Sequence, residues 1–564
     1  MQLFIKKFAL PVMTWLAIAN LVVAENAPTR AKNGMVISQT EIASQVGADV
    51  MKDGGNAVDA AVATAFALAV THPSAGNIGG GGFLVFRPAS GEPVTYDFRE
   101  MAPAKATDTM WLENGEYSYE RHHLSHLSVG VPGTVAGMHL AWTDHGSLPW
   151  ERLVEPAIRL AREGFVVSDG LARSLDSSME RMGKYPATKA QFSKNGAPYE
   201  AGDILKQEDL AESLVRIAEK GPAGFYEGET ARLIAEEMAK NGGLITEDDL
   251  KEYRAKKRAP IRGTYRGYDI ISMPPPSSGG IVIVEMLNIL EGYDVAGDGF
   301  GSARNLHRMA ESMRRAYSDR AQYLGDPDFN PDMPIERLTS KEYAAQLRRT
   351  IQADRASKST PESFEWPSES PETTHYSVVD AERNAVSVTY TLEYGYGSGI
   401  VVPGAGFLLN NEMGDFNGAP GLTDENGLIG TSPNLTAPHK RMLSSMTPTI
   451  VAKDGKLLMV TGSPGGRTII NTVFQTILNV VDHDMSAQAA VDAGRIHHQW
   501  LPDRIRYERQ SFSPDTLNVL TWMGHNLSET TNQGSAHVIV LNHEDDWLEG
   551  GVDRRSADTG AAGY

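Results

Sequence analysis

The stretch PETTHYSVVD, residues 371–380, decides how the rest of the chain is interpreted. It follows RASKSTPESFEWPSES (355–370), a run of Ser, Pro and charged residues with no packing period. The sequence that comes next alternates apolar and polar residues over 386–391, which is typical of a half-buried strand. Thr373 and Thr374 thus stand where an exposed linker enters a strand. Taken alone, such a pair is ordinary, because β-branched residues favour strands.

The linker suggests a second interpretation of Thr373. A threonine hydroxyl is a weak nucleophile unless a base lies beside it, and an N-terminal threonine carries that base as its own α-amine. The reference pKa of that amine, about 7.7–8.0, leaves a useful fraction unprotonated at neutral pH. An internal threonine becomes N-terminal only when the preceding peptide bond is cut. Cleavage between Glu372 and Thr373 would therefore create a nucleophile, and a flexible linker would let the cut ends separate.

Composition narrows the class of protein. A chain of 564 residues is too long for one core, so two or more cores or one large layered unit are expected. The 52 basic and 71 acidic residues give a net charge of −19, which argues against a nucleic-acid partner. The sequence contains no cysteine, which excludes disulfides, thiolate nucleophiles and Cys-ligated zinc.

The first residues have the pattern of a targeting segment. Lys6 and Lys7 precede the apolar run FALPVMTWLAIANLVV, and Ala24 ends a plausible cleavage site. An uncleaved anchor helix is the alternative, but the modest apolar length and the proline within it favour cleavage. No later stretch approaches the roughly 20 apolar residues that a membrane span needs. The sequence predicts a signal peptide over 1–24 and an exported, soluble mature protein, either periplasmic or secreted.

The periodicity of the chain predicts a layered fold. Thr246 and Asp249 are spaced almost as in a capping box, and they start one helix. Further helices are expected over 41–52, 57–70, 305–323 and 341–354. The part after Thr373 instead contains strands with period-two alternation. Helix-rich layers beside β-hairpins favour a layered sandwich with antiparallel pairing over a doubly wound parallel sheet.

Several other motifs give weak signals. GNIGGGGF (76–83) and GSPGGRT (462–468) lack the spacing or context of a nucleotide loop. GSPGG nevertheless stands between a strand and a helix start, where backbone N–H groups can point at an anion or simply form a tight turn. HHLSH (122–126) and HHQW (497–500) lack the spaced acidic partner of H-E-x-x-H, so we expect surface or structural histidines rather than a metal site. The absence of a G-x-S-x-G elbow disfavours a serine α/β-hydrolase.

The chain resembles the γ-glutamyltranspeptidase (glutathione hydrolase) family of the N-terminal nucleophile hydrolase superfamily. The resemblance covers nearly everything after the signal segment and rests on ordered blocks, among them DAAVATAFALAV, GNIGGGGF, DFREMAPAKAT, VGVPGTVAGM, MPPPSSGG, TTHYSVVD, LNNEMGDF, KRMLSSMTPT and TGSPGG. It implies an α+β fold, a four-layer αββα sandwich built from two chains of one self-cleaved precursor. The large subunit would span 25–372 and the small subunit 373–564, with Thr373 attacking the Glu372 carbonyl.

The resemblance also implies the catalytic residues. Thr373 would attack the γ-amide carbonyl with its own α-amine as general base. Thr391 matches the hydroxyl that supports the nucleophile. The backbone N–H groups of Gly465 and Gly466 match the donors that hold the tetrahedral oxyanion.

A second group of residues would bind the glutamyl head, which is zwitterionic at its α-carbon. Arg99 matches the ligand of the α-carboxylate, which a guanidinium grips with two parallel hydrogen bonds. Ser444 and Ser445 match the hydroxyls that assist it. Glu412 and Asp415 match the acceptors of the α-ammonium, while Thr391, Glu393 and Gly466 complete the substrate-binding set.

Three positions depart from the family pattern. Glu393 stands where many members carry Asn, and a carboxylate there would still attract an ammonium. Gly414 replaces the first Asp of a common DDF run, whereas Asp415 keeps the second. The segment 419–440 matches a flexible lid but lacks the aromatic residue that some members place over the substrate, and Asn426 stands near that point. The balance of hydrolysis and transfer is therefore left open.

The function implied is that of an exported γ-glutamyl transferase and glutathione hydrolase. Glutathione or another γ-glutamyl amide would acylate Thr373, and water or an amino acid or peptide would accept the glutamyl group. No metal or organic cofactor is expected, because nucleophile, base and oxyanion donors are all protein groups. One alternative is an acylase of the same superfamily for glutaryl or cephalosporin-type amides, which lack the α-ammonium. Another is a secreted binding protein that kept the fold and lost the chemistry.

Overall fold

The computed structural model describes residues 26–359, 373–422 and 430–564. The predicted signal segment, Glu372 and Asn426 lie outside the described residues. Two seven-stranded sheets form the centre of the molecule, and every strand pair in them is antiparallel. Strands from before and after Thr373 occur in both sheets, so the two predicted chains share one fold.

Each sheet combines strands from distant parts of the sequence. The first sheet contains β1 (Thr29–Ala31), β20 (Trp547–Val552), β19 (His537–Asn542), β15 (Lys456–Gly462), β14 (Thr449–Lys453), β11 (Tyr268–Ser272) and β10 (Ile261–Tyr265). The second contains β21 (Gly560–Gly563), β2 (Met35–Ser38), β12 (Thr374–Val379), β13 (Ala385–Thr391), β3 (Gly81–Arg87), β4 (Val94–Phe98) and β9 (Lys256–Arg258). The predicted strand after the linker is therefore a central β12–β13 hairpin.

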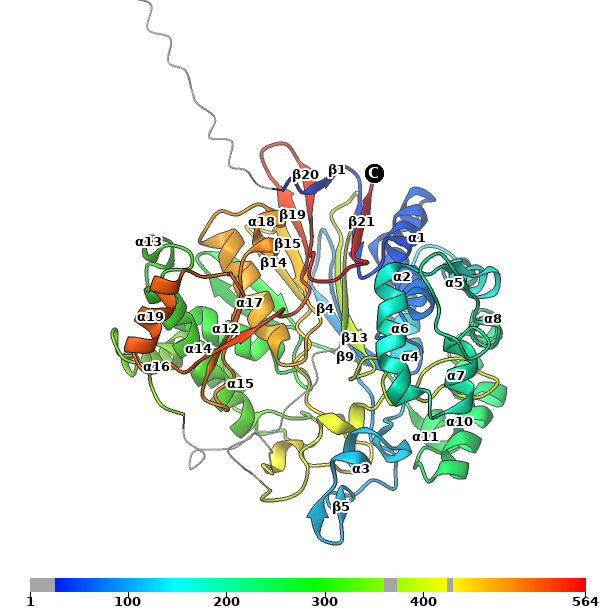
Figure 1. Ribbon diagram of the computed structural model, residues 1–564. Helices are drawn as coiled ribbons and strands as arrows, with labels where there is room; N and C mark the ends of the chain where they lie inside the picture. Colours follow the sequence, from blue (N-terminus) through cyan, green and yellow to red (C-terminus); the bar gives the residue numbers. More distant parts are fainter. Residues whose placement is uncertain (1–25, 360–372, 423–429) are drawn as a thin grey trace, which may run out of the picture.

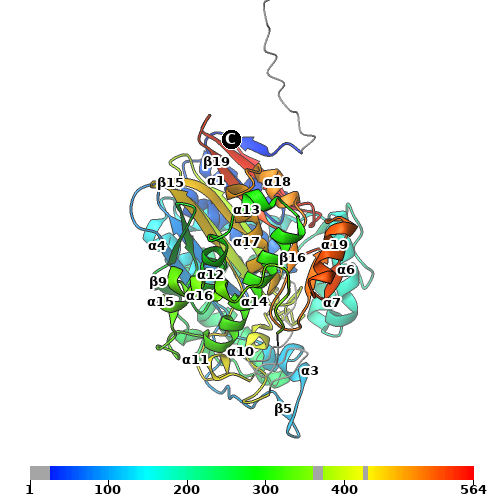
Figure 2. The same ribbon diagram turned by 90° about the vertical axis from the view of Figure 1, so that its left-hand side faces the viewer.

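Helices cover the outer face of each sheet. Figure 1 shows the two sheets between two groups of helices, and Figure 2 shows one group in front of the first sheet. The first sheet is covered by α12 (Gly279–Leu290) and α17 (Thr468–Val481), and α14 (Ala303–Tyr323) and α16 (Lys341–Arg349) pack on α12. The second sheet is covered by α1 (Glu41–Lys52), α2 (Ala57–Thr71) and α4 (Thr134–His145). Outside them, α5 (Trp150–Glu163) packs on α2, and α8 (Glu208–Lys220) packs on α5. The predicted four-layer αββα sandwich is confirmed.

Most helices begin and end close to the residues predicted from the sequence, because capping residues and apolar composition determine their ends. Thr40 caps α1 by accepting the Ala43 N–H, and Asn56 forms a capping box at the start of α2. All residues of α2 are buried, as its small apolar composition predicts. The expected capping box of Thr246 is present at α11 (Glu247–Glu252). The helix predicted over 341–354 is shorter, because α16 ends at Arg349.

The layer between the two sheets is partly polar. The residues of β13 that face α2 belong to an apolar cluster, whereas those on the other face are Ser and Thr after the first residue, Ala385. Ser387 Oγ donates to the carbonyl of Thr461 in the opposite sheet at 3.0 Å. His375 Nδ1 lies 2.8 Å from Thr389 Oγ1. Ser387 thus joins the hairpin that carries Thr373 to the opposite sheet, whereas the contact of His375 with Thr389 lies across the hairpin itself.

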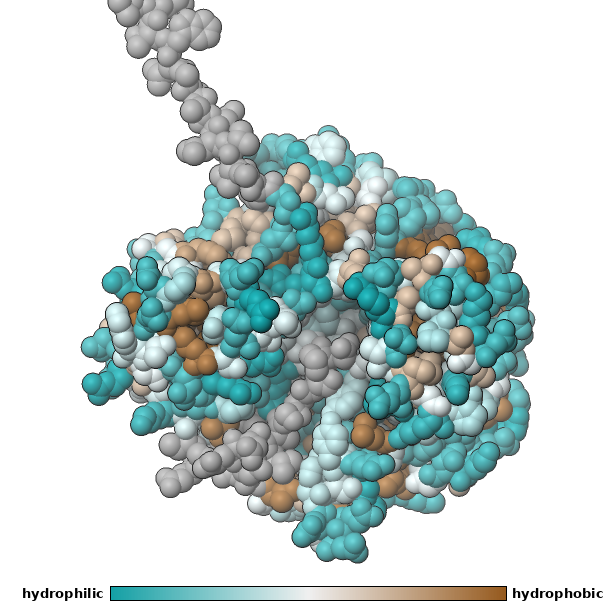
Figure 3. All heavy atoms as spheres, in the orientation of Figure 1, coloured by the Kyte–Doolittle hydropathy of each residue, from teal (hydrophilic) through white to brown (hydrophobic). Residues whose placement is uncertain are grey.

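The face seen in Figure 3 is predominantly hydrophilic, with hydrophobic residues in small separate groups. Among the described residues, no helix is both long enough and apolar enough to span a membrane.

Candidate active site

The register of the central hairpin brings Thr373 next to Thr391. Thr374 pairs with Tyr390 across β12 and β13, so one further step places Thr373 opposite Thr391. The exposed fractions of these two residues are only 6% and 2%. Thr391 is in turn opposite Gly81 of β3, where a Cβ would lie 2.4 Å from the carbonyl oxygen of Phe98 and 2.8 Å from Glu100 Oε2, so only glycine fits beside the hairpin end. The predicted nucleophile and its supporting hydroxyl therefore lie side by side at the edge of a pocket.

That pocket gathers residues from distant parts of the sequence. Its lining consists of Arg99, Thr373, Thr391, Glu393, Glu412, Asp415, Ser444, Ser445, Met446, Gly466 and Ile469. Every predicted site residue that the structure describes is among them except Gly465, which precedes Gly466 in the same turn. The charged lining residues are one arginine and three acids. The pocket therefore offers partners for both signs of a zwitterion.

Arg99 follows directly after β4 and is completely buried. Its two terminal nitrogens donate to Glu412 and Asp415. Its Nε donates to the carbonyl of Met442 at 3.3 Å. Burial alone would lower the pKa of Arg99, but the neighbouring carboxylates outweigh it and raise that pKa above its ordinary value. The guanidinium is thus nearly saturated by protein acceptors, and a substrate carboxylate would have to take over one of them.

The acids around Arg99 come from a short 3-10 helix, η3 (Glu412–Asp415), and from the residue next to Arg99. Burial raises the pKa of Glu412 well above its usual range, although the Arg99 guanidinium opposes that change. Burial likewise raises the pKa of Glu100 to about 7, and this carboxyl lies 3.7 Å from Arg99. Several carboxyl groups therefore crowd around one arginine, and a cationic group that entered the pocket would favour their ionised forms.

The two predicted serines, Ser444 and Ser445, are contacted by the proline-serine turn between β11 and α12. Ser278 donates to the carbonyl of Ser444 through its N–H at 2.8 Å and its hydroxyl at 2.7 Å. Arg320 of α14 donates to Ser278 Oγ at 2.7 Å and to Ser445 Oγ at 3.0 Å. Backbone and buried guanidinium contacts thus position Ser444 and Ser445 at the pocket wall. Arg320 had no sequence signal that linked it to this site.

The glycine turn lies between β15 and α17, where the sequence placed it. Gly465 and Gly466 have φ angles of 134° and 55°, which favour glycine. The carbonyl of Gly465 accepts from the N–H of Thr468 at 3.1 Å and from its hydroxyl at 2.7 Å. Neither glycine N–H has a hydrogen-bond acceptor within the described residues. The two donors stand at the N-terminus of a helix, a position that favours negative charge.

One pocket neighbour was missed in the sequence. His123, in α3 (Tyr119–His123), places its Nδ1 3.3 Å from Glu393 Oε1. The expectation that HHLSH holds surface or structural histidines was thus incomplete: His122, His123 and His126 are buried, and one of them touches the pocket lining. No sequence signal pointed to this pair, because its members stand far apart in the chain.

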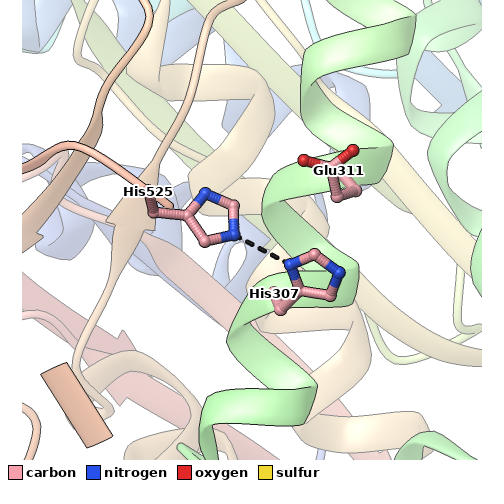
Figure 4. A group of neighbouring side chains, drawn as sticks. All are labelled: His307, Glu311 and His525. Atoms are coloured by element: carbon pink, nitrogen blue, oxygen red, sulfur yellow. Dashed lines mark hydrogen bonds between the residues drawn. The ribbon is translucent and has the colours of Figure 1, made fainter. Parts of the chain in front are cut away.

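A second buried group of titratable residues lies away from the pocket, at α14. Figure 4 shows His307 and Glu311 on one helix face and His525 opposite, with His307 Nδ1 2.8 Å from His525 Nε2. Glu311 accepts from Arg315 Nη1 at 2.7 Å and from Arg314 Nε at 3.2 Å. Because the Glu311 carboxylate already accepts hydrogen bonds from two guanidiniums, the group is better explained as an ion-pair cluster than as a metal site. We interpret the group as an anchor for the segment that precedes the linker.

Ser357 connects the segment that precedes the linker to this anchor. Its N–H donates to Glu311 at 3.1 Å and its hydroxyl at 2.5 Å. His307 Nε2 lies 2.7 Å from the carbonyl of Gln352. The segment after α16 is therefore held against α14 without continuing as a helix, which explains why the predicted helix over 341–354 ends early.

We expect Glu311→Gln to lower the free energy of unfolding on the order of 3 kcal/mol at neutral pH. Burial alone would raise the pKa of Glu311, but Arg314, Ser357 and Arg315 together lower it to about 2. Because this pKa is depressed in the folded state, the stabilisation is complete above the unfolded pKa and is lost as the pH falls toward 2. Urea denaturation at neutral and acidic pH measures the change, and the variant should lose stability less steeply with acid.

The matched control for this prediction is Glu342→Gln, which changes an exposed acid on α16. It should alter the free energy of unfolding by less than about 0.5 kcal/mol. Equal stability of the Glu311 variant and the native protein at neutral pH would show that the carboxylate does not anchor the segment.

The two packed sheets, with a buried threonine at the head of a central hairpin, define the N-terminal nucleophile hydrolase class. The chain belongs to the γ-glutamyltranspeptidase family, whose signature (Gamma-glutamyltranspeptidase) matches residues 43–563. The chain is 51% identical over 542 residues to a glutathione hydrolase proenzyme of Escherichia coli (strain K12), covering 95% of this chain and 93% of that protein.

Solved structures agree with this assignment. A cephalosporin acylase from Bacillus halodurans superposes with a TM-score of 0.84 at 27% identity, over 98% of this chain and 99% of its own. The γ-glutamyltranspeptidase of Helicobacter pylori gives a TM-score of 0.56 at 47% identity, over 57% of this chain and 92% of its own. The family and the fold thus follow from sequence and structure independently.

Proposed function

We propose that this protein is a γ-glutamyltransferase and glutathione hydrolase whose nucleophile is Thr373. The observation that carries the proposal is the pocket, in which Thr373 and Thr391 face Arg99 and three acids. A γ-glutamyl group presents a carboxylate and an ammonium on one carbon, and this pocket has partners for both. The pairs that Arg99 forms with Glu412 and Asp415 would be exchanged for pairs with the substrate.

Maturation would begin with the precursor. Thr373 Oγ attacks the carbonyl of Glu372, the peptide nitrogen leaves as an amine, and water hydrolyses the resulting ester. The products are a large subunit of residues 25–372 and a small subunit of residues 373–564. Because both sheets contain strands from both sides of the cut, the subunits stay together as a heterodimer.

Turnover would follow the same chemistry on the substrate. Thr373 Oγ attacks the γ-carbonyl carbon while the α-amine of Thr373 takes the hydroxyl proton and passes it to the leaving amine. Two preorganised N–H donors at Gly465 and Gly466 stabilise the oxyanion, each worth a few kcal/mol of barrier. Glutathione would release Cys-Gly. Water, or the amine of an amino acid or peptide, then attacks the γ-glutamyl ester and regenerates Thr373.

Export completes the proposal. The pattern of residues 1–24 supports a signal peptide and a periplasmic or secreted destination. The chemistry needs only protein groups and a small-molecule substrate, and the net charge of −19 gives no basis for a nucleic-acid partner.

A glutaryl or cephalosporin-type acylase is the second candidate, favoured by the likeness to a cephalosporin acylase. The two activities differ in the α-ammonium, which a glutaryl group lacks. An acylase would leave the acids of the pocket without that partner, at a cost typical of an unpaired buried polar site. We expect kcat/KM for γ-glutamyl-p-nitroanilide to exceed that for glutaryl-p-nitroanilide by roughly 100-fold.

Release of p-nitroaniline measures both substrates in the same assay. A glutaryl rate equal to or above the γ-glutamyl rate would assign the acylase function instead. Turnover of neither anilide by processed protein would support a binding protein that kept the fold and lost the chemistry.

A further inference from the structure

The contact between His123 and Glu393 has no role in the chemistry above, although Glu393 lines the pocket. The exposed fractions of the two residues are 4% and 6%. A buried histidine beside a buried acid is stable only if one of the two facing atoms carries a proton and the other accepts it. The protonation of this pair follows from the hydrogen bonds on its far side.

A chain of hydrogen bonds determines which ring nitrogens carry protons. His122 Nε2 lies 3.1 Å from the carbonyl of Met413, which can only accept, so this nitrogen carries the proton. Burial lowers the pKa of His122 well below its usual value, so the ring is neutral and its Nδ1 is an acceptor. The Tyr117 hydroxyl, 2.9 Å away, therefore donates its single proton to His122 Nδ1.

The same hydroxyl decides the state of His123. Since the proton of Tyr117 is already used, its oxygen can only accept from His123 Nε2, 3.3 Å away. Burial lowers the pKa of His123 to about 4, so this ring is also neutral near pH 7. Its Nδ1 then carries a lone pair and faces Glu393 Oε1 at 3.3 Å. An ionised carboxylate in that place would set lone pair against lone pair.

We infer that Glu393 is held as a neutral carboxylic acid whose O–H donates to His123 Nδ1, which makes His123 a positioning residue that sets the charge of the substrate pocket. This inference rests on the proposed function, because it concerns how the pocket binds the ammonium of a γ-glutamyl group. Above the pKa of His123, which is about 4, and as long as the shared proton is retained, the pair contributes no charge. When the shared proton is lost, the pair adds one negative charge to the pocket.

Two backbone features make room for the pair. A Cβ at Gly414 would lie 2.3 Å from His123 Nδ1 and 2.8 Å from Glu393 Oε2, so any other residue would displace the ring. Glu393 itself has a φ of 77°, and its N–H donates to Thr391 Oγ1 at 2.9 Å. The hydroxyl beside the nucleophile thus helps hold Glu393 in this unusual conformation. The two departures from the family pattern, at 393 and 414, are therefore parts of one arrangement.

Other charges act on the pair from several elements. Among the described residues the titratable and charged groups around it are Tyr117, Tyr119, His122, Arg181, Tyr394, Glu412 and Asp415. Arg181, in α6 (Asp169–Met182), favours the ionised acid, whereas Glu412 and Asp415 in the same pocket favour the neutral one. The ionisation that adds a charge should therefore strengthen binding of the substrate ammonium.

The test is the pH dependence of KM and kcat for γ-glutamyl-p-nitroanilide between about pH 5 and about pH 8.5. In the native protein KM should fall roughly fivefold as the pH rises through the ionisation of the pair, with little change in kcat from this source. His123→Gln replaces the acceptor with an amide that can donate to an ionised carboxylate. In His123→Gln the KM should not change with pH in this way and should stay at the low value that the native protein reaches at high pH. In Glu393→Gln the KM should also lack the pH-dependent fall, but it should stay at the high value that the native protein has at low pH.

His126→Gln is the matched control, because His126 also pairs with an acid, Glu237 at 2.9 Å, outside the pocket. Its KM should follow the native profile. A His123→Gln profile that retains the native step, or a native KM without any step, would overturn the inference. The other acids and the α-amine of Thr373 titrate in all four proteins, so only the difference between variants is diagnostic.

Infrared spectroscopy tests the same inference without turnover. At neutral pH the difference spectrum between the native protein and Glu393→Gln should contain the carbonyl stretch of one protonated carboxyl, because other protonated acids such as Glu412 are present in both proteins. The corresponding difference spectrum for His126→Gln should lack this band. An unchanged protonated-carboxyl region in Glu393→Gln would overturn the inference. This result holds even if His123→Gln fails to fold. It also separates the inference from the proposed function, which fails only if the processed native protein does not cleave the γ-glutamyl anilide.

Discussion

Thr373→Ala should accumulate as one uncut chain and show no measurable γ-glutamyl turnover. The substitution removes the hydroxyl that attacks Glu372 during maturation and the γ-carbonyl during catalysis. Without the cut, the nitrogen of residue 373 also stays in an amide and cannot act as a base. We expect kcat to fall at least roughly 10⁴-fold, the scale of losing the nucleophile in other acyl-transfer enzymes.

A denaturing gel with N-terminal sequencing of the smaller band tests the maturation step. The native protein should give a fragment that begins TTHYSVVD, which the variant lacks. Thr374→Val is the matched control, because Thr374 is the next residue, fully buried and paired with Tyr390 rather than part of the pocket. It should still be cut. If Thr373→Ala instead released a fragment that starts at the substituted position, Thr373 would not be required for cleavage.

Thr373→Ser separates the two roles of the hydroxyl. Serine retains both a nucleophile and, after cleavage, an α-amine, so the chain should still be cut and retain part of its activity. If serine were cut at the native rate but inactive, the residue would have a role in turnover beyond that of nucleophile.

Much of the fold was predictable because its signals are local. The boundaries of α1 and α2 follow from caps and apolar composition, and the hairpin that carries Thr373 follows from strict alternation. The αββα arrangement came from resemblance rather than periodicity, and the structure confirms it. The C-terminal end of α16 could not be predicted, because remote contacts with Glu311 and His307 hold the next segment outside the helix.

The site was less accessible to sequence reasoning because its contacts are remote. Arg99 reaches Glu412 and Asp415 across more than half of the chain, and only the resemblance suggested that they meet. His123 was placed with structural histidines because its acidic partner is Glu393, far along the sequence. The sequence alone gives no link between Gly414 and Glu393, because the ring of His123 that contacts both positions comes from a distant part of the chain.

Arg99→Lys should lower kcat/KM for γ-glutamyl substrates roughly 100-fold, mainly through KM. Lysine keeps the positive charge but replaces a planar fork with a single ammonium, so it cannot grip a carboxylate with two parallel hydrogen bonds. The loss of one charge-assisted hydrogen bond in a buried site is worth about 3 kcal/mol, which is the size of the expected change. Two protein acids that now share the guanidinium would also compete for the smaller group.

Arg441→Lys provides the comparison that isolates binding from folding. Arg441 is also buried and paired with an acid, Asp97 at 2.5 Å, but it does not line the pocket. Both variants should therefore lower the melting temperature, because each weakens a buried ion pair. Only Arg99→Lys should raise KM, and KM of the Arg441 variant should stay within about threefold of the native value. Equal KM values for Arg99→Lys and native protein would mean that the α-carboxylate binds elsewhere, and that Arg99 serves only to hold Glu412 and Asp415.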